Sequence, residues 1–162
     1  MMFGSKAPEF VVLQAQRSDV DRIAALHGEN FARGWSGHEI ETMLDRPEAT
    51  VLVIRRVGAP NEPICGFNIY QQSLEEAEIL SIAVDTEYRR LGFADRLVRF
   101  AISALQGDRV KALFLEVDAK NHAAIGLYDR LGFRKVGERP AYYQGGDEGE
   151  AANALVMRLT LD

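Results

Sequence analysis

The 162-residue sequence has little of several features that mark particular classes of protein. Its single cysteine, Cys65, excludes an internal disulfide, and the apolar residues around it are typical of a core position in a reducing compartment. No apolar run is long enough to span a bilayer, and the first residues lack the apolar core of a signal peptide. We therefore expect a cytoplasmic protein without a membrane partner.

An excess of basic charge and a metal-binding pattern are missing as well. The formal net charge of −5 argues against general binding of nucleic acid. The three histidines, His27, His38 and His122, lack the spacing of metal ligands, so no metal is expected. Residues 1–81 carry the whole net charge of −5, whereas residues 82–162 are neutral overall. The first half would attract a cationic partner, although a solvated acidic surface explains the same pattern.

The order of predicted elements indicates a mixed α/β fold of about seven strands and four helices, with a largely antiparallel sheet and no internal repeat. The length suits one domain, residues 1–162, with a core from about residue 8 to residue 161. The expected strands lie at residues 10–15, 50–57, 64–71, 77–84, 112–117, from 133 onward, and 152–161. Helices are expected between the first two strands, after residue 92 and after residue 121.

Capping residues predict where these helices begin and end. Ser18 is the expected N-cap of a helix that runs to about residue 31. Ser36 and Glu39 have the spacing of a capping box, and Pro47 ends the helix that they begin. Asn121 is a suitable N-cap for a short helix that closes at Gly132.

An arginine-rich loop joins the apolar strand at residues 79–84 to an amphipathic helix, with the sequence Arg89-Arg90-Leu91-Gly92-Phe93-Ala94. Gly92 allows the backbone to approach a ligand closely, and the free N–H groups of the first helical turn favour an anion such as pyrophosphate. The helix carries apolar residues at three- and four-residue spacing, namely Leu97, Phe100, Ala101, Ala104 and Leu105. Taken alone, a plain strand-to-helix turn with solvated arginines explains the loop equally well.

This loop resembles the pyrophosphate-binding signature, Gln/Arg-x-x-Gly-x-Gly/Ala, of the GCN5-related N-acetyltransferases (GNAT), which bind acetyl-coenzyme A there. Asp95 departs from the pattern, because a basic or neutral residue is usual at that position. With one glycine the loop is neither a Rossmann fingerprint nor a P-loop. The residues that the resemblance places on acetyl-coenzyme A are Ile82, Ala83, Val84, Arg89, Arg90, Leu91, Gly92, Phe93, Ala94, Asp95 and Asn121.

Three polar residues downstream could carry chemistry. Glu116 interrupts an apolar strand, so its carboxylate must be paired, reach solvent through a cleft or have a raised pKa. Tyr128 lies two helical turns beyond Asn121 on the same face. Taken alone, a solvent-facing glutamate, a capping asparagine and a packed tyrosine are the commoner explanation of these residues.

Several longer segments of the sequence resemble the ribosomal-protein-alanine N-acetyltransferases of the RimI type, and the resemblance covers about residues 8–161. They are Phe31-x-x-x-Trp35-Ser36, Ile82-Ala-Val-Asp85, Leu115-Glu-Val117, the block from Asn121 to Phe133, and Tyr142-Tyr143. The resemblance implies a GNAT fold and acetylation of a protein N-terminal amine, that of an alanine on a basic small-subunit ribosomal protein. It further implies Glu116 as general base, directly or through water, Tyr128 as the acid for the leaving thiolate, and Trp35, Tyr142 and Tyr143 beside the acceptor.

The pKa of the acceptor bears on this choice. An α-amine with a pKa near 8 is about a tenth neutral at pH 7, whereas a lysine near 10.4 is only about 0.04% neutral, so the α-amine is the easier nucleophile. Two other readings stay open. In one, the acceptor is a lysine side chain, a peptide or a small amine. In the other, the chain is a catalytically silent module that binds acyl-coenzyme A.

Overall fold

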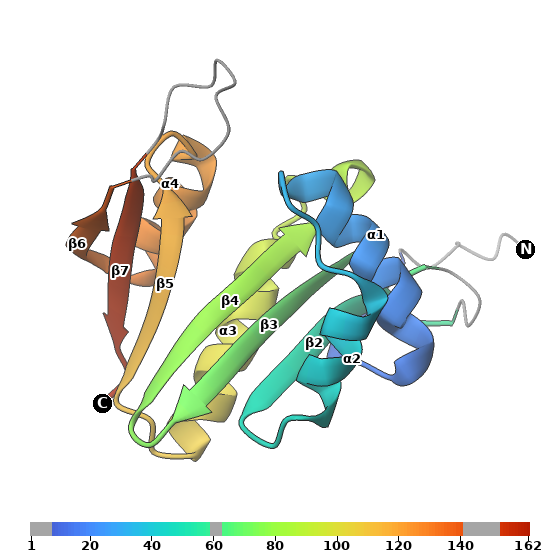
Figure 1. Cartoon of the computed structure of the whole chain (residues 1–162), viewed down its shortest axis with the longest axis horizontal. Coiled ribbons are helices and arrows are strands. Elements are labelled where there is room, and N and C mark those ends of the chain that lie inside the picture. Colours follow the sequence, from blue (N-terminus) through green and yellow to red (C-terminus); the bar gives the residue numbers. More distant parts are fainter. Residues whose placement is uncertain (1–7, 59–62, 141–152) are drawn as a thin grey trace, which may run out of the picture. The chain divides into compact units, whose positions relative to one another are not determined.

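The computed structural model describes residues 8–58, 63–140 and 153–162 (Figure 1). Its α-helices are α1 (Val20–Asn30), α2 (Gly37–Asp45), α3 (Phe93–Gly107) and α4 (His122–Leu131), with short 3-10 helices η1 (Arg17–Asp19) and η2 (Thr86–Tyr88). Its strands are β1 (Phe10–Gln14), β2 (Ala49–Arg56), β3 (Gly66–Ser73), β4 (Glu76–Val84), β5 (Ala112–Asp118), β6 (Arg134–Arg139) and β7 (Ala154–Thr160).

Within these described ranges the strands form one seven-stranded mixed sheet in the order β1-β2-β3-β4-β5-β7-β6. The pairs β1·β2, β5·β7 and β6·β7 are antiparallel, whereas β4 and β5 are parallel. The predicted order of helices and strands and the predicted mixed sheet are therefore confirmed. The chain divides into two compact units, Met1–Ile69 with Ser81–Phe100 and Tyr70–Leu80 with Ala101–Asp162, which we call the first and second unit.

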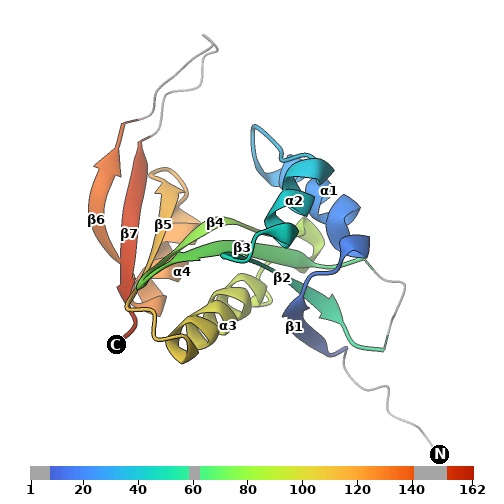
Figure 2. The ribbon, with the colours of Figure 1, turned by 60° about the horizontal axis from the view of Figure 1, so that its bottom comes forward.

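In the first unit, helices cover both faces of the strands (Figure 2). Helices α1 and α2 lie on one face of β2 and β3, and the start of α3 lies on the other. The four consecutive residues Val51–Ile54 of β2 are all buried, as expected of a strand covered on both sides. Asn68 of β3 is fully buried and donates from Nδ2 to the carbonyl oxygen of Leu97 in α3 at 3.3 Å. Cys65 is also buried, at 1% exposure, as the sequence predicted.

In the second unit, β5, β7 and β6 lie side by side with α4 beside β5 (Figures 1 and 2). The side chains of β5 alternate between a buried face with Leu113, Leu115 and Val117 and a more exposed face with Glu116. Strand β6 pairs with β7 through a register shift between Lys135 and Gly137, which marks a β-bulge.

Two local predictions were wrong. Ser18 does not cap a helix, because it lies inside η1, and α1 starts only at Val20 after the Asp19 N-cap. Phe100 and Ala104 are exposed on α3, since the buried stripe follows a slightly rotated path. That stripe consists of Phe93, Leu97, Val98, Ala101 and Leu105.

Candidate functional site

The loop that precedes α3 has the backbone that its sequence predicted. Gly92 adopts a φ of +79°, a conformation that favours glycine, and Arg90 also has a positive φ of +65°. Helix α3 begins directly afterwards at Phe93. A Cβ atom built on Gly92 would meet no other atom within 4 Å, so the space beside this backbone is open. The N–H groups of the first turn of α3 have no partner inside the helix and are available to an anion.

The arginines of the loop differ in their contacts. The guanidinium of Arg89 donates to Oδ1 of Asn30, at the end of α1, at 2.7 Å. Arg90 is exposed and has no ion pair within the described residues. Arg99 binds the Asp95 carboxylate at 2.7 Å, one helical turn along α3. The acidic residue that departs from the family pattern is thus neutralised by its own helix, and Arg90 adds a positive charge that no described carboxylate pairs.

An ion pair anchors the start of the loop. Asp85, just beyond β4, binds the guanidinium of Arg22 in α1, and the two side chains are 14% and 28% exposed. Oδ1 of Asp85 also accepts the backbone N–H of Glu87 at 3.0 Å, and its own N–H donates to the carbonyl of Cys65 at 2.8 Å. Because Arg22 and Asp85 are 63 residues apart, no local sequence signal predicts this pair.

The end of β4 packs tightly against β3. A Cβ atom at Gly66 would lie 2.9 Å from the carbonyl oxygen of Ala83, so only glycine fits there. Ala83 is 8% exposed, whereas Ile82 and Val84 are partly exposed. Ile82, Ala83 and Val84 therefore stand directly before the loop on a strand end whose backbone is fixed by its neighbour.

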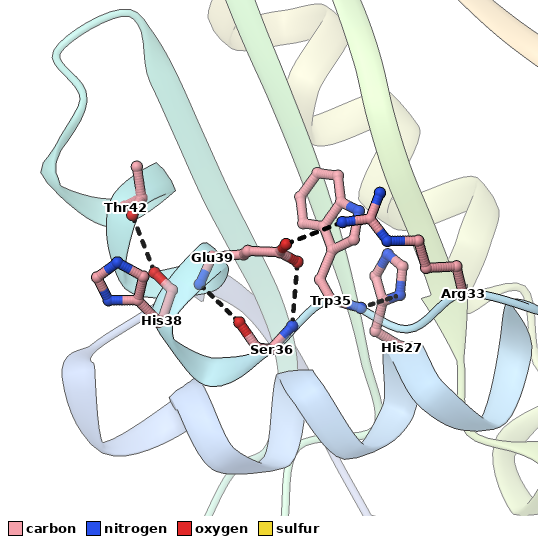
Figure 3. Close-up of polar contacts among 7 residues, drawn as sticks. All are labelled: His27, Arg33, Trp35, Ser36, His38, Glu39 and Thr42. Carbon is pink, nitrogen blue, oxygen red and sulfur yellow. Dashed lines mark hydrogen bonds and ion pairs between the residues drawn. The ribbon is translucent and has the colours of Figure 1, made fainter.

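Trp35 lies in a segment between α1 and α2 that is held from both sides (Figure 3). Its backbone N–H donates to Nδ1 of His27 at 3.1 Å, and the two rings stack 4.9 Å apart at 17°. The predicted capping box follows, because Ser36 Oγ accepts the Glu39 N–H at 3.2 Å and the Glu39 carboxylate accepts the Ser36 N–H at 3.1 Å. Glu39 also pairs with Arg33 at 3.1 Å. The capping box is confirmed, whereas the predicted place of Trp35 beside an acceptor stays a prediction; the contact of His27 was missed.

In the second unit, Glu116 is paired and reaches solvent. Its carboxylate lies 3.0 Å from the guanidinium of Arg139 on β6, and the side chains are 35% and 68% exposed. Both residues line a cavity of about 290 Å³, together with Gln71, Ser73, Glu76, Ala77, Glu78, Phe114, Leu115 and Val156. Of the three possibilities for a charged residue in this strand, the structure thus selects ion pairing and access through a cavity. Arg139 was missed, because no local pattern links it to Glu116.

Tyr128 lies on α4 and Asn121 directly precedes this helix, as predicted. Asn121 is the N-cap, with Oδ1 accepting the Ala124 N–H at 3.2 Å, and Gly132 closes the helix at a φ of +99°. Tyr128 is 6% exposed and its ring packs edge-on against Phe133 at 5.5 Å. Burial raises the pKa of Tyr128 from 10.0 to about 12. Its hydroxyl is therefore a weaker acid than that of an ordinary tyrosine, whose pKa is near 10.

The other residues predicted at the site differ in exposure or lie outside the described ranges. Leu91 is 58% exposed beside Gly92, and Phe93 is 5% exposed at the start of α3. Tyr142 and Tyr143 lie outside the described residues. Among the residues that the structure describes, no cluster of three or more potential ligands could hold a metal ion. The described helices include none with the length and apolar character needed to cross a membrane.

Comparison with known proteins places the chain in a family. Residues 20–133 match the model of the acetyltransferase (GNAT) family. The [ribosomal protein bS18]-alanine N-acetyltransferase of Escherichia coli (strain K12) is 40% identical over 101 residues, 62% of this chain and 67% of that protein. The enzyme of the same name from Haemophilus ducreyi is 35% identical over 120 residues, 74% of this chain and 81% of its own. The crystal structure of the ribosomal-protein-S18-alanine N-acetyltransferase from Escherichia coli superimposes with a TM-score of 0.82 at 28% identity, covering 94% of both chains.

Proposed function

The chain belongs to the acetyltransferase (GNAT) family. We propose that it transfers the acetyl group of acetyl-coenzyme A to the α-amine of the N-terminal alanine of a ribosomal protein. The chain is an N-acetyltransferase, and its whole length would serve this one reaction as a single domain. The identity to two bS18-alanine N-acetyltransferases carries the choice of acceptor. The lower basicity of an α-amine compared with lysine supports the same choice.

Acetyl-coenzyme A fits the loop before α3 on three grounds. Gly92 leaves open space beside its backbone, the first turn of α3 offers free N–H groups, and Arg90 is exposed without an ion pair in the described residues. These groups would bind the pyrophosphate, and Asn121 would contribute a further contact. Acetyl-coenzyme A supplies an activated thioester, so the protein need only bind, orient and move protons.

In this proposal Glu116 takes a proton from the acceptor ammonium, so that the neutral nitrogen forms a bond to the acetyl carbon while the carbon–sulfur bond breaks. Glu116 suits the role because it reaches solvent in a cavity, where its ion pair with Arg139 can exchange for the acceptor. A backbone N–H near Val84 would stabilise the oxyanion. Tyr128 would donate its proton to the departing thiolate and regain one from solvent, to which the amide nitrogen loses its second proton.

The raised pKa of Tyr128 has two consequences for that last step. The hydroxyl stays protonated over the whole working range of pH, so the donor is always present. Transfer to a thiolate whose conjugate acid has a pKa of about 8.5 is, however, uphill by several pKa units. We therefore assign Tyr128 a hydrogen bond that stabilises the thiolate as well as the final protonation.

The acceptor would be engaged by the first unit around Trp35, and by Tyr142 and Tyr143. The net charge of −5 on residues 1–81 favours a basic protein N-terminus. If this is correct, the KM for a basic acceptor peptide should rise with salt, and Trp35→Ala should raise it further. A KM that responds to neither change would place the acceptor elsewhere.

The test of the proposal uses the purified chain, acetyl-coenzyme A and peptides that begin Ala-Arg. We expect release of the coenzyme A thiol together with the gain of one acetyl mass on the peptide. The matched control is the same peptide with a blocked N-terminus. Equal modification of the blocked peptide would indicate a lysine acceptor, and binding of acetyl-coenzyme A without thiol release for any amine would indicate a silent module.

A further inference from the structure

The side chain of His27 makes a hydrogen bond that joins α1 to residues 31–36, which we call the Trp35 segment. It is 3% exposed, and its Nδ1 atom accepts the backbone N–H of Trp35 at 3.1 Å. An imidazole nitrogen that accepts an N–H must be unprotonated, so the proton of the neutral ring resides on Nε2. The arrangement in Figure 3 therefore requires the neutral form of His27.

The Trp35 segment also contacts α1 through its backbone at Gly34. A Cβ atom on Gly34 would lie 2.9 Å from the Cα atom of Gly28, so the two backbones touch. The His27 ring is also enclosed by aromatic rings, with Phe31 at 4.4 Å, Trp35 at 4.9 Å and Phe67 of β3 at 5.9 Å. Within the described residues, the Trp35 N–H has no hydrogen-bond acceptor other than Nδ1 of His27.

Protonation of His27 would turn Nδ1 into a donor that faces the Trp35 N–H. Burial lowers the pKa of His27 below its ordinary 6.5, against the opposing effects of Glu39 and a backbone hydrogen bond. Glu39 of α2 already binds Arg33 and the Ser36 N–H, and the facing residues Phe31 and Phe67 are uncharged. The neutral ring is thus the form that the fold favours, and its contribution to stability is present above pH 6.5 and lost as the pH falls through the lowered pKa.

We propose that His27 is a positioning residue for the acceptor: the neutral imidazole holds the Trp35 segment in the arrangement that binds the acceptor, and protonation releases it. The inference rests on the proposed function in one respect, the contact between Trp35 and the acceptor. Its consequence is a loss of acceptor affinity in mild acid that does not arise from titration of the acceptor amine.

Trp35 is the sole tryptophan of the chain, so its fluorescence reports on this segment directly. We expect the emission spectrum to change reversibly between about pH 8 and about pH 5 while far-UV circular dichroism stays constant. The midpoint should lie below 6.5. A spectrum that does not change before the whole chain unfolds would overturn the proposal.

Substitutions separate the acceptor atom from the ring. His27→Asn offers an oxygen in place of Nδ1 and does not titrate, so the fluorescence transition should vanish. His27→Phe keeps the stacked ring without an acceptor, and its spectrum at neutral pH should resemble the acid form of the wild type. His38→Gln, on the exposed surface of α2, is the matched control and should keep the transition. A transition that persists in His27→Asn would refute the role of His27.

If His27→Asn does not fold, nitrogen chemical shifts of the wild-type histidines give the same test. The inference requires an unprotonated Nδ1 for His27 at neutral pH and its protonation together with the fluorescence change. A His27 shift that shows a protonated Nδ1 at neutral pH would contradict it.

The link to the acceptor is tested by binding rather than turnover. An N-acetylated peptide that begins Ala-Arg has no amine to titrate at its terminus, and its affinity should fall at least about threefold between about pH 7.5 and about pH 5.5. His27→Asn should show no such fall, and the affinity for acetyl-coenzyme A should stay constant in both proteins. Unchanged peptide affinity across the fluorescence transition would refute the inference. If thiol release and peptide acetylation were still observed in that case, the proposed function would stand. Absence of acetyl transfer with both pH effects present would instead refute the proposed function alone.

Discussion

The candidate binding residues of the first unit and the candidate catalytic residues of the second unit offer different kinds of chemical group to a ligand. In the first unit the groups offered to a ligand are largely backbone, namely the left-handed Gly92 and the N–H groups at the start of α3. In the second unit they are side chains in opposite surroundings. Glu116 is partly exposed and paired, whereas Tyr128 is buried with a raised pKa.

This difference separates binding from chemistry. Backbone groups are fixed by the fold and do not titrate near neutral pH, which suits recognition of a constant pyrophosphate. Side chains carry the protons that must move, and their surroundings determine their proton affinity. Changes at Glu116 and Tyr128 should therefore alter turnover, whereas changes in the loop of the first unit should alter acetyl-coenzyme A affinity.

The largest effect is expected for Glu116→Gln. Removing the general base should lower kcat about 10²- to 10⁴-fold, with partial recovery at high pH where the acceptor amine is already neutral. The measurement is a pH profile of kcat with an Ala-Arg peptide, beside the acetyl-coenzyme A affinity, which should barely change. Near wild-type turnover in a variant that binds acetyl-coenzyme A would return Glu116 to a structural role.

Tyr128→Phe should come next, with a loss of about 10²-fold in kcat, because it keeps the ring packed against Phe133 and removes only the proton donor. High pH should not rescue this variant. The wild type should show no loss of activity near pH 10 from ionisation of Tyr128, since burial raises its pKa to about 12. Recovery of the variant at high pH would mean that the two residues do not act at different proton transfers.

Gly92→Val should weaken acetyl-coenzyme A binding at least about tenfold, or about 1.4 kcal/mol, and leave the folded structure in place. Valine disfavours a φ of +79° and its side chain would fill the open space beside the loop. Gly107→Val at the other end of α3 is the control, since that glycine has no positive φ and no atom within 4 Å of a Cβ. Equal affinities for the two variants, measured by calorimetry, would remove the loop from the binding site.

Arg139→Gln should have the smallest effect, a change in unfolding free energy of less than about 1 kcal/mol. The ion pair with Glu116 is too exposed to contribute more, at 68% and 35% exposure. Urea denaturation measures the change, and Lys135→Gln, which removes another exposed pair on β6, provides the comparison. A much larger loss of unfolding free energy for Arg139→Gln alone would show that Arg139 fixes the Glu116 side chain. The side chains of the second unit would then be held as firmly as the backbone groups of the first.

The sequence by itself determined the features that depend on neighbouring residues. The capping box of Ser36 and Glu39, the Asn121 N-cap and the left-handed Gly132 all form as predicted, because each involves atoms within a few residues of one another. The order of the elements and the glycine turn before α3 follow from equally local patterns. Even local prediction can fail, as at Ser18, which was predicted to cap a helix. Gln16 and Asp19 form the turn around Ser18, because the Gln16 N–H donates to the Asp19 carboxylate.

Tertiary structure decided which side chains meet and how deeply they are buried. The pairs Arg22–Asp85 and Glu116–Arg139 and the contact of His27 with Trp35 join separate elements, and no periodicity in the chain encodes them. The shift in the pKa of Tyr128 likewise depends on burial, which the sum of packed neighbours sets. Local patterns therefore specified the helix caps and the loop, the resemblance to a family indicated the candidate residues, and long-range packing determined their partners and burial.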